Sequence, residues 1–286
     1  MSAVPEKSKL HERARLRLSE CSIAAAQTSA GEPARSWRDN LAPGISTEEV
    51  EAAYSADPAW RADLALPHSS AALTVNLFAP WRDDLDKLTL GEVSGFTSFR
   101  LEVEASLGLD GTPAYFDAIG MSDRRVVAIE VKCLEYLSDP PEKYRIGFEQ
   151  SIGRICEAHG LSEEGWLGEA NRLKRDPAAY GALFAHQLVK QAFALEHQHK
   201  SGRQLLIYLY WEPTDWQKHP FFEQHRSELA RLSRTVAGER IAFRYLSVSD
   251  LIAAWAHVSQ PAWLAGHVEY LKHRYEVEIG NIGGSD

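Results

Sequence analysis

The sequence predicts an α/β protein with a helical N-terminal region and a central mixed β-sheet of about five strands flanked by helices. Three observations lead to this fold class. Helix-start signals dominate the chain before Phe96, and three consecutive runs with the period or composition of strands lie between Phe96 and Val131. Beyond Val131, helical patterns alternate with strand-like runs, as they do where helices pack on the faces of a sheet.

The region before the first strand is expected to be helical. Residues 10–18 have the pattern of a short amphipathic helix. Ser46 and Glu49 have the spacing of a capping box, in which each side chain bonds the backbone of the other residue, so a helix is expected to begin there. Ser69 or Ser70 can cap a further helix that leads towards the first strand.

Three strands are expected next, and we predict that they form a meander. Apolar and charged residues alternate over residues 96–104, which is the period of a half-buried strand. A second strand is expected at residues 114–119, and a polar turn at residues 123–125 follows it. Residues 126–131 are mostly β-branched and nearly all apolar, as expected of a central strand.

The rest of the chain is expected to alternate helix and strand. Asp176 and Pro177 form a cap and first-turn pair, and residues 178–200 contain no helix breaker apart from Gly181. We therefore expect the longest helix of the chain over residues 178–200. Further strands are expected at residues 204–211 and 241–246, with a helix between them and another after them.

The composition is that of an ordinary folded protein. Apolar residues make up 44% of the 286 residues and charged residues 25%, so neither wholesale disorder nor a fibrous architecture is indicated. The net charge of -9 and the pI of about 5.7 argue against a protein that holds nucleic acid by bulk positive charge alone. A local basic groove and metal-binding carboxylates remain compatible with this charge.

The cysteines and the apolar runs bear on location. Cys21, Cys133 and Cys156 lie far apart without a C-x-x-C pair, which favours a reducing compartment and gives no support to a structural zinc site. The N-terminus lacks the apolar core of a signal peptide, and no run approaches the roughly 18 apolar residues that span a membrane. We therefore expect a cytoplasmic protein without a membrane segment.

One group of side chains on the expected meander has the chemistry of an active site. Asp117 lies on the second strand, while Glu130 and Lys132 lie two residues apart on the third and so share a face. The two carboxylates and the Val131 carbonyl are hard oxygen ligands that suit Mg²⁺ or Mn²⁺. The Lys132 ammonium can position or help to deprotonate the attacking water, or balance charge in the transition state.

These residues resemble a known family. Pro113-Ala114-Tyr115-Phe116-Asp117 followed by Ile129-Glu130-Val131-Lys132 resembles the PD-(D/E)XK nuclease superfamily, which has the restriction-endonuclease-like fold. The resemblance covers roughly residues 70–211 and implies a helix, three strands, and then further helices and strands around a central sheet. It also implies a metal-dependent nuclease. The proline departs from the family pattern, because three residues separate it from Asp117.

A poorly characterised bacterial branch of this superfamily is more similar still. In that branch a Glu ends the first strand and a second Glu lies shortly after the E-x-K, positions that match Glu104 and Glu135 here. A Gln early in the following helix matches Gln187, although Lys190 stands where an Arg is expected. Glu102 shares a strand face with Glu104 by period-two geometry, so either could be the further carboxylate. The resemblance favours Glu104.

The sequence therefore predicts a metal-dependent nuclease acting on DNA, in which a carboxylate-bound Mg²⁺ and a lysine-assisted water hydrolyse phosphodiester bonds. We expect a helical N-terminal region over residues 1–66 and a nuclease-like domain over residues 67–286, or one continuous domain. A homo-oligomer is compatible with the sequence, which does not indicate the oligomeric state. Two alternatives stay open, a non-catalytic nucleic-acid-binding or assembly protein with this fold and a hydrolase of small phosphate esters. The expected catalytic residues are Asp117, Glu130, Lys132, Glu104 and Gln187, and the expected metal ligands are Asp117, Glu130, Val131 and Glu104.

Overall fold

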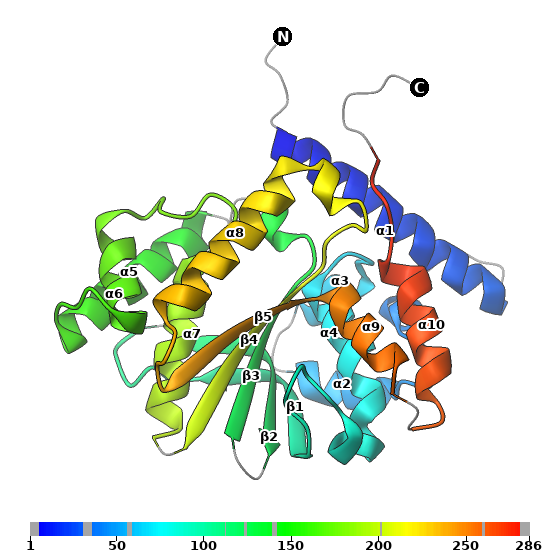
Figure 1. The fold of residues 1–286 in the computed structure, drawn as a ribbon. Helices are drawn as coiled ribbons and strands as arrows, with labels where there is room; N and C mark the ends of the chain where they lie inside the picture. The colour runs from blue at the N-terminus through cyan, green and yellow to red at the C-terminus, as the bar shows by residue number, and fades with distance from the viewer. Residues whose placement is uncertain are drawn as a thin grey trace.

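A five-stranded mixed sheet forms the centre of the computed structural model, with helices on both faces (Figure 1). The structure describes residues 6–30, 36–55, 59–111, 113–122, 125–138, 142–200, 202–258 and 261–280. The predicted α/β class, the central mixed sheet and the helical N-terminal region are confirmed. Residues 123 and 124 of the expected polar turn lie outside the described residues.

The strands follow one another across the sheet in chain order. They are β1 (Phe96–Ala105), β2 (Ala114–Ser122), β3 (Arg125–Lys132), β4 (Arg203–Tyr210) and β5 (Ile241–Ser247). The first three pair antiparallel, which confirms the predicted meander, and β3, β4 and β5 pair parallel. Helices connect the parallel strands, as parallel pairing requires. Because β3 pairs antiparallel with β2 and parallel with β4, the two halves of the sheet meet at β3.

Helices cover the two faces of the sheet in separate groups. The α-helices are α1 (Glu6–Ala30), α2 (Thr47–Tyr54), α3 (Trp60–Ala65), α4 (Ser70–Phe78), α5 (Glu142–His159), α6 (Gly165–Arg175), α7 (Ala185–Gln198), α8 (Pro220–Thr235), α9 (Val248–Ala256) and α10 (Leu264–Tyr275). The short 3₁₀ helices are η1 (Trp37–Asn40), η2 (Ala79–Lys87), η3 (Glu135–Leu137) and η4 (Trp216–Lys218). Buried residues of α1, α4, α9 and α10 form one core with the sheet, which we call the α4 face. Those of α5, α6 and α7 form the core on the opposite side, the α7 face.

Alternation along β3 explains how one strand serves both cores. Val127, Ile129 and Val131 pack on the α4 face, whereas Val126 and Ala128 pack on the α7 face. Continuous apolar sequence is what a strand buried on both faces requires. The prediction of a central strand over residues 126–131 is confirmed.

Two of the predicted helix starts are confirmed by their caps. The Ser46 side chain accepts a hydrogen bond from the Glu49 N–H at 3.4 Å and begins α2. The Ser69 side chain accepts one from the Ala72 N–H at 3.1 Å and begins α4. In both cases the hydroxyl satisfies a backbone donor that the first turn of a helix leaves without a partner.

The prediction of one long helix over residues 178–200 is wrong. The helix there, α7, begins only at Ala185 and has 14 residues, whereas α1 has 25. The backbone N–H groups of Gly181, Ala182 and Leu183 donate to the Glu228 carboxylate of α8 at 2.7–2.9 Å. Because this carboxylate from a distant segment holds three successive donors, the chain turns here instead of continuing a helix. Helices α5 and α6 were not predicted.

Strand alternation fails in the middle of β1 and β2. Leu101 packs on the α4 face, yet Val103, two residues later, packs on the α7 face. On β2, Phe116 and Ala118 lie on opposite faces in the same way, and these residues pair with Val103 and Leu101 across the ladder. Between them Glu102 has a φ of +48°, in the left-handed region that residues other than glycine seldom adopt. The regular period-two geometry from which a shared face of Glu102 and Glu104 was predicted therefore does not hold at Glu102.

Candidate active site

Asp117 lies where β2 separates from β3. The pairing of these strands is described from Ser122 as far as Ala118 opposite Ile129, next to Asp117. Beyond this point an Asp117 side-chain oxygen, Oδ2, accepts the Val131 N–H at 2.6 Å. The carboxylate thus bonds a backbone group of β3 at the place where the two strands diverge, and this bond orients the side chain beside the end of β3.

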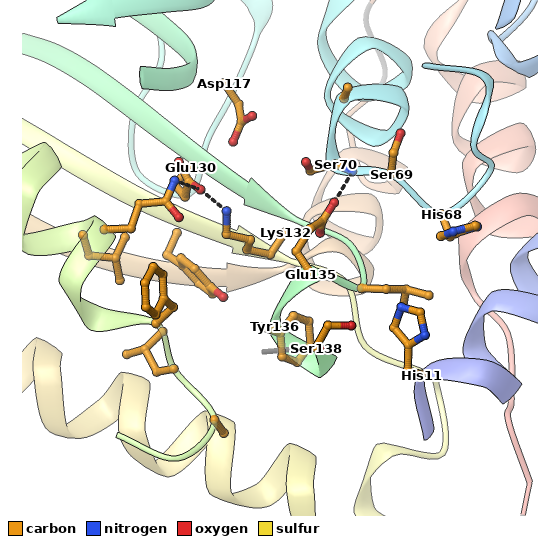
Figure 2. Close-up of a pocket in the computed structure, with 18 of the residues that line it drawn as sticks. His11, His68, Ser69, Ser70, Asp117, Glu130, Lys132, Glu135, Tyr136 and Ser138 are labelled. Atoms are coloured by element: carbon orange, nitrogen blue, oxygen red, sulfur yellow. Dashed lines mark hydrogen bonds and ion pairs between the residues drawn. The ribbon is translucent and has the colours of Figure 1, made fainter. Parts of the chain in front are cut away.

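Glu130 and Lys132 lie at the end of β3 and point towards each other (Figure 2). Glu130 is buried, with 2% of its surface exposed, and forms an ion pair with the Lys132 ammonium. Its carboxylate also accepts hydrogen bonds from Gln187 at 2.6 Å and from Gln191. A buried carboxylate requires such donors, because an unpaired charge in the interior is costly.

The two glutamines come from one face of α7. They are four residues apart, which places both side chains over the end of β3. Gln191 also donates to the Tyr115 carbonyl at 2.7 Å, so it connects β2, β3 and α7. The structure brings Gln187 to the site as predicted from the resemblance, whereas Gln191 was missed. Its spacing of four from Gln187 on the same helix was the available signal.

Burial and like charge set the protonation of the central groups. Burial raises the pKa of Asp117 well above its usual range, and the Glu130 charge raises it further. For Lys132, burial lowers the pKa, but the charges of Glu130, Asp117 and Glu135 outweigh this effect, so the pKa is raised overall. Lys132 is therefore protonated at neutral pH, and it can donate hydrogen bonds but cannot take a proton there.

The two glutamates of β1 have different surroundings. Glu102 lines the cavity that contains Asp117, Glu130 and Lys132. Glu104 is exposed, accepts a hydrogen bond from the Tyr115 hydroxyl at 2.9 Å and does not belong to the lining of that cavity. The left-handed backbone at Glu102 accounts for this difference, since it places neighbouring positions of β1 on unexpected faces.

Glu135, which the resemblance matched, and Lys190, which departs from the family pattern, have contacts of their own. Glu135 accepts the backbone N–H groups of Ser70 and Cys133, each at 2.7 Å, and so connects the start of α4 to the end of β3 (Figure 2). Lys190 is buried on α7, and its ammonium lies 5.3 Å from the centre of the Phe148 ring. The described contacts of Glu135 are those of a structural link.

The donor set of the site fits a hard divalent cation. Within the described residues no three His, Cys, Asp or Glu side chains already converge at ligand positions. Mg²⁺ usually keeps several waters and binds only one or two carboxylates, so Asp117, Glu130 and the Val131 carbonyl suffice in kind. The raised pKa of Asp117 comes first from burial of its carboxyl group and then from the charge of the nearby Glu130, a repulsion that a cation would relieve. Three side chains donate to Glu130, and the two oxygens of a carboxylate have about four acceptor positions, so these contacts leave one position for a cation.

The cavity around these groups has a volume of about 730 Å³ and extends beyond them in two directions. On the α7 side its lining includes an aromatic group, Phe148, Tyr180 and Phe184. On the α1 and α4 side its lining includes a basic group, Lys7, His11 and His68. Asp117, Glu130 and Lys132 thus lie in one continuous cavity with an aromatic end and a basic end.

The mixed sheet, with acidic and basic side chains at the end of its central strand, defines a protein of the restriction-endonuclease-like class. A family model described as "Restriction Endonuclease associating with ARP" matches residues 10–276, and the chain belongs to this family. No curated protein and no solved structure matches the chain. Of the helices in the described parts of the chain, none combines the length and the apolar character required to cross a bilayer.

Proposed function

We propose that this protein is a metal-dependent nuclease that hydrolyses phosphodiester bonds of DNA. The observation that carries the proposal is the convergence of Asp117, Glu130 and Lys132 on one cavity at the end of β3. The family description supports an endonuclease in general terms. The substrate and the metal are our inference from the chemistry of the side chains.

Asp117, Glu130 and the Val131 carbonyl are the proposed ligands of Mg²⁺ or Mn²⁺. When bound, the ion supplies Lewis-acid stabilisation of the negative charge that develops on the phosphate. The Val131 N–H holds the Asp117 carboxylate in place through the 2.6 Å hydrogen bond. Gln187 and Gln191 orient the Glu130 carboxylate, so we assign both glutamines as positioning residues.

Lys132 is proposed to hold the attacking water and to balance charge in the transition state. Its raised pKa keeps the ammonium protonated, so it is a hydrogen-bond donor and not the base. The proton of the water then needs another acceptor. Glu102 supplies a further carboxylate in the same cavity, and we propose that it takes this proton. The water oxygen bonds to phosphorus as the opposite bond to the sugar oxygen breaks, and the sugar oxygen leaves with the electron pair and takes a proton from solvent.

The proposal is tested by incubating the purified protein with supercoiled, linear and single-stranded DNA and with RNA, in Mg²⁺, Mn²⁺ or EDTA. Cleavage of DNA by the wild type in Mg²⁺ or Mn²⁺, and loss of cleavage in EDTA and in Asp117→Ala and Lys132→Ala, is the expected result. Lys132→Ala leaves the buried Glu130 carboxylate without its ion-pair partner, so its melting curve is recorded as a folding control. Equal cleavage by the wild type and both variants would overturn the proposed site.

One alternative has an observation in its favour. A cavity of about 730 Å³ has the size of a small-ligand site, which suits a hydrolase of small phosphate esters. Assays with bis(4-nitrophenyl) phosphate and with short oligonucleotides separate the two functions. Turnover of the small diester without cleavage of any polynucleotide would favour the alternative. A non-catalytic nucleic-acid-binding protein is disfavoured by the complete set of Asp117, Glu130 and Lys132.

The family description also names ARP as an associated component. We carry this over as a proposal that ARP is a partner of the present chain. Copurification of the two from cells that produce both would support it, and their separation at low salt would contradict it.

A further inference from the structure

The basic end of the cavity is built by parts of the chain outside the central sheet. Lys7 and His11 lie on α1, and His68 lies just before α4. The His11 and His68 rings meet edge to face, with 6.5 Å between their centres and 86° between their planes. Figure 2 shows both rings on the far side of Lys132 from Glu130. None of these three residues has a role in the proposed hydrolysis.

His68 has a polar atom that lacks a partner. Its side chain is half-buried, and its Nδ1 atom is shielded from solvent with no hydrogen-bond partner among the described residues. Burial lowers the pKa of His68, and the charges of His11 and Arg15 lower it further. A phosphate beside the two imidazoles would counteract the effect of these positive neighbours.

The acidic residues nearby are largely engaged in other contacts. Both oxygens of Glu135 accept backbone N–H groups. Glu12 is bound by Arg15 through two hydrogen bonds of 2.7 and 3.0 Å on the surface of α1. Asp63 also lines the cavity and is the acid that offsets part of the positive charge. Lys7, His11 and His68 still present three nitrogen-bearing side chains to this end.

The arrangement along the cavity matches a single polynucleotide strand. Aromatic side chains on which a base can stack lie on the α7 side, the proposed metal ligands lie in the middle, and the basic group lies on the α1 side. A volume of about 730 Å³ is in the range of small-ligand pockets, which suits a short stretch of one strand. We propose that Lys7, His11 and His68 bind a phosphate of a single DNA strand next to the phosphate that is cleaved. This inference rests on the proposed nuclease function, because it places the cleaved phosphate at Asp117 and Glu130.

The test measures binding of fluorescein-labelled single-stranded DNA by anisotropy in EDTA, where no metal-dependent cleavage occurs. The variants are His11→Ala and His68→Ala, with the exposed His257→Ala as the matched control. We expect each of the first two to bind about tenfold more weakly, since each loses a hydrogen bond to a charged group. The slope of log K against log salt should fall by about 0.7 for each lost phosphate contact. His257→Ala should bind as the wild type does.

A second set of strands identifies the phosphate. Each carries one uncharged methylphosphonate, moved stepwise along the strand. We expect one position to weaken binding by the wild type and to have no further effect on the His11→Ala and His68→Ala double variant, because the charge and its partners form one interaction. Because His11 is only partly buried on a surface helix, His11→Ala tests the inference even where His68→Ala unfolds.

The outcomes separate this inference from the proposed function. Binding by the histidine variants equal to that of His257→Ala, or no binding by the wild type, would overturn the phosphate site even if the protein cleaves DNA. A position-specific methylphosphonate effect without cleavage in any metal would uphold the phosphate site and overturn the nuclease function. Binding of a duplex as tight as that of the single strand, or of RNA in preference to DNA, would overturn the proposed ligand.

Discussion

The end of β3 and the middle of β1 and β2 contribute acidic residues to the same cavity by different backbone geometry. On β3 the side chains alternate regularly, so Glu130 and Lys132 lie on one face as period-two spacing requires. At Glu102 and Asp117 the neighbouring residues change faces, and Glu102 has a φ of +48°. Regular strand geometry on β3 therefore brings Glu130 and Lys132 together as an ion pair. Irregular geometry on β1 and β2 determines which other acidic side chains line the cavity.

The largest effect is expected on the regular strand. Glu130→Gln removes the carboxylate that pairs with Lys132 and accepts from Gln187 and Gln191, so one substitution disturbs three contacts. We expect DNA cleavage to fall by about a thousandfold, as for the loss of a group that acts on the transition state. Initial rates on plasmid DNA in saturating Mg²⁺ measure it, with a melting curve as the folding control. Cleavage within tenfold of the wild type would remove Glu130 from the proposed centre.

The contrast between the two regions also limits what the sequence could predict. Residues 126–131 are mostly β-branched and apolar, which predicted the strand. The two-residue period of a strand then placed Glu130 and Lys132 on the same face. Nothing local marks the change of face at Glu102, because its two neighbours on β1 are held by pairing with β2 and the left-handed backbone between them is not a preference of glutamate. The same holds for residues 178–184, where a carboxylate 45 or more residues away ends the helical pattern.

The irregular region gives the second prediction, a comparison within β1. Glu102→Gln is expected to lower cleavage by about a hundredfold, since it removes the proposed proton acceptor. Glu104→Gln is the matched control, because Glu104 is exposed, bonds Tyr115 and does not line the cavity. Its rate should stay within twofold of the wild type. A reversed order of the two variants would restore Glu104 as the functional acid.

Metal binding gives the third prediction, and it needs no substrate. A ligand at a hundred times its Kd stabilises the folded state by about 2.7 kcal/mol, which corresponds to about 5 °C in Tm for a chain of this size. We expect this rise for the wild type in Mg²⁺ and none for Asp117→Asn, in which the amide can still accept the Val131 N–H. Glu102→Gln should keep the rise if its carboxylate is a proton acceptor. A full shift in Asp117→Asn would contradict its role as a ligand.

Gln187 and Gln191 show which site residues can be predicted from a sequence once the position of a helix is known. Their spacing of four puts both on one face of α7, so the second follows from the first. The contact of Gln191 with the Tyr115 carbonyl does not follow, because it depends on how α7 crosses the separating ends of β2 and β3. Helical spacing therefore predicts which residues lie side by side on one helix. Their contacts with other strands depend on how the helix packs against the sheet.

The smallest effect is expected for stability against pH in the absence of metal. Burial and the Glu130 charge raise the pKa of Asp117 above its unfolded value, so the folded state binds its proton more tightly. The stabilisation of the folded state by this proton is complete below the unfolded pKa of about 3.9, and it is lost as the pH rises through the pKa of Asp117 in the folded state. The Tm of the wild type in EDTA should therefore fall by a few degrees more than that of Asp117→Asn between pH 5 and pH 8. If the Tm of the two proteins changes with pH in the same way, burial and the Glu130 charge do not raise the pKa of Asp117. The position of Asp117 next to Glu130 would then cost no electrostatic free energy for a metal ion to offset.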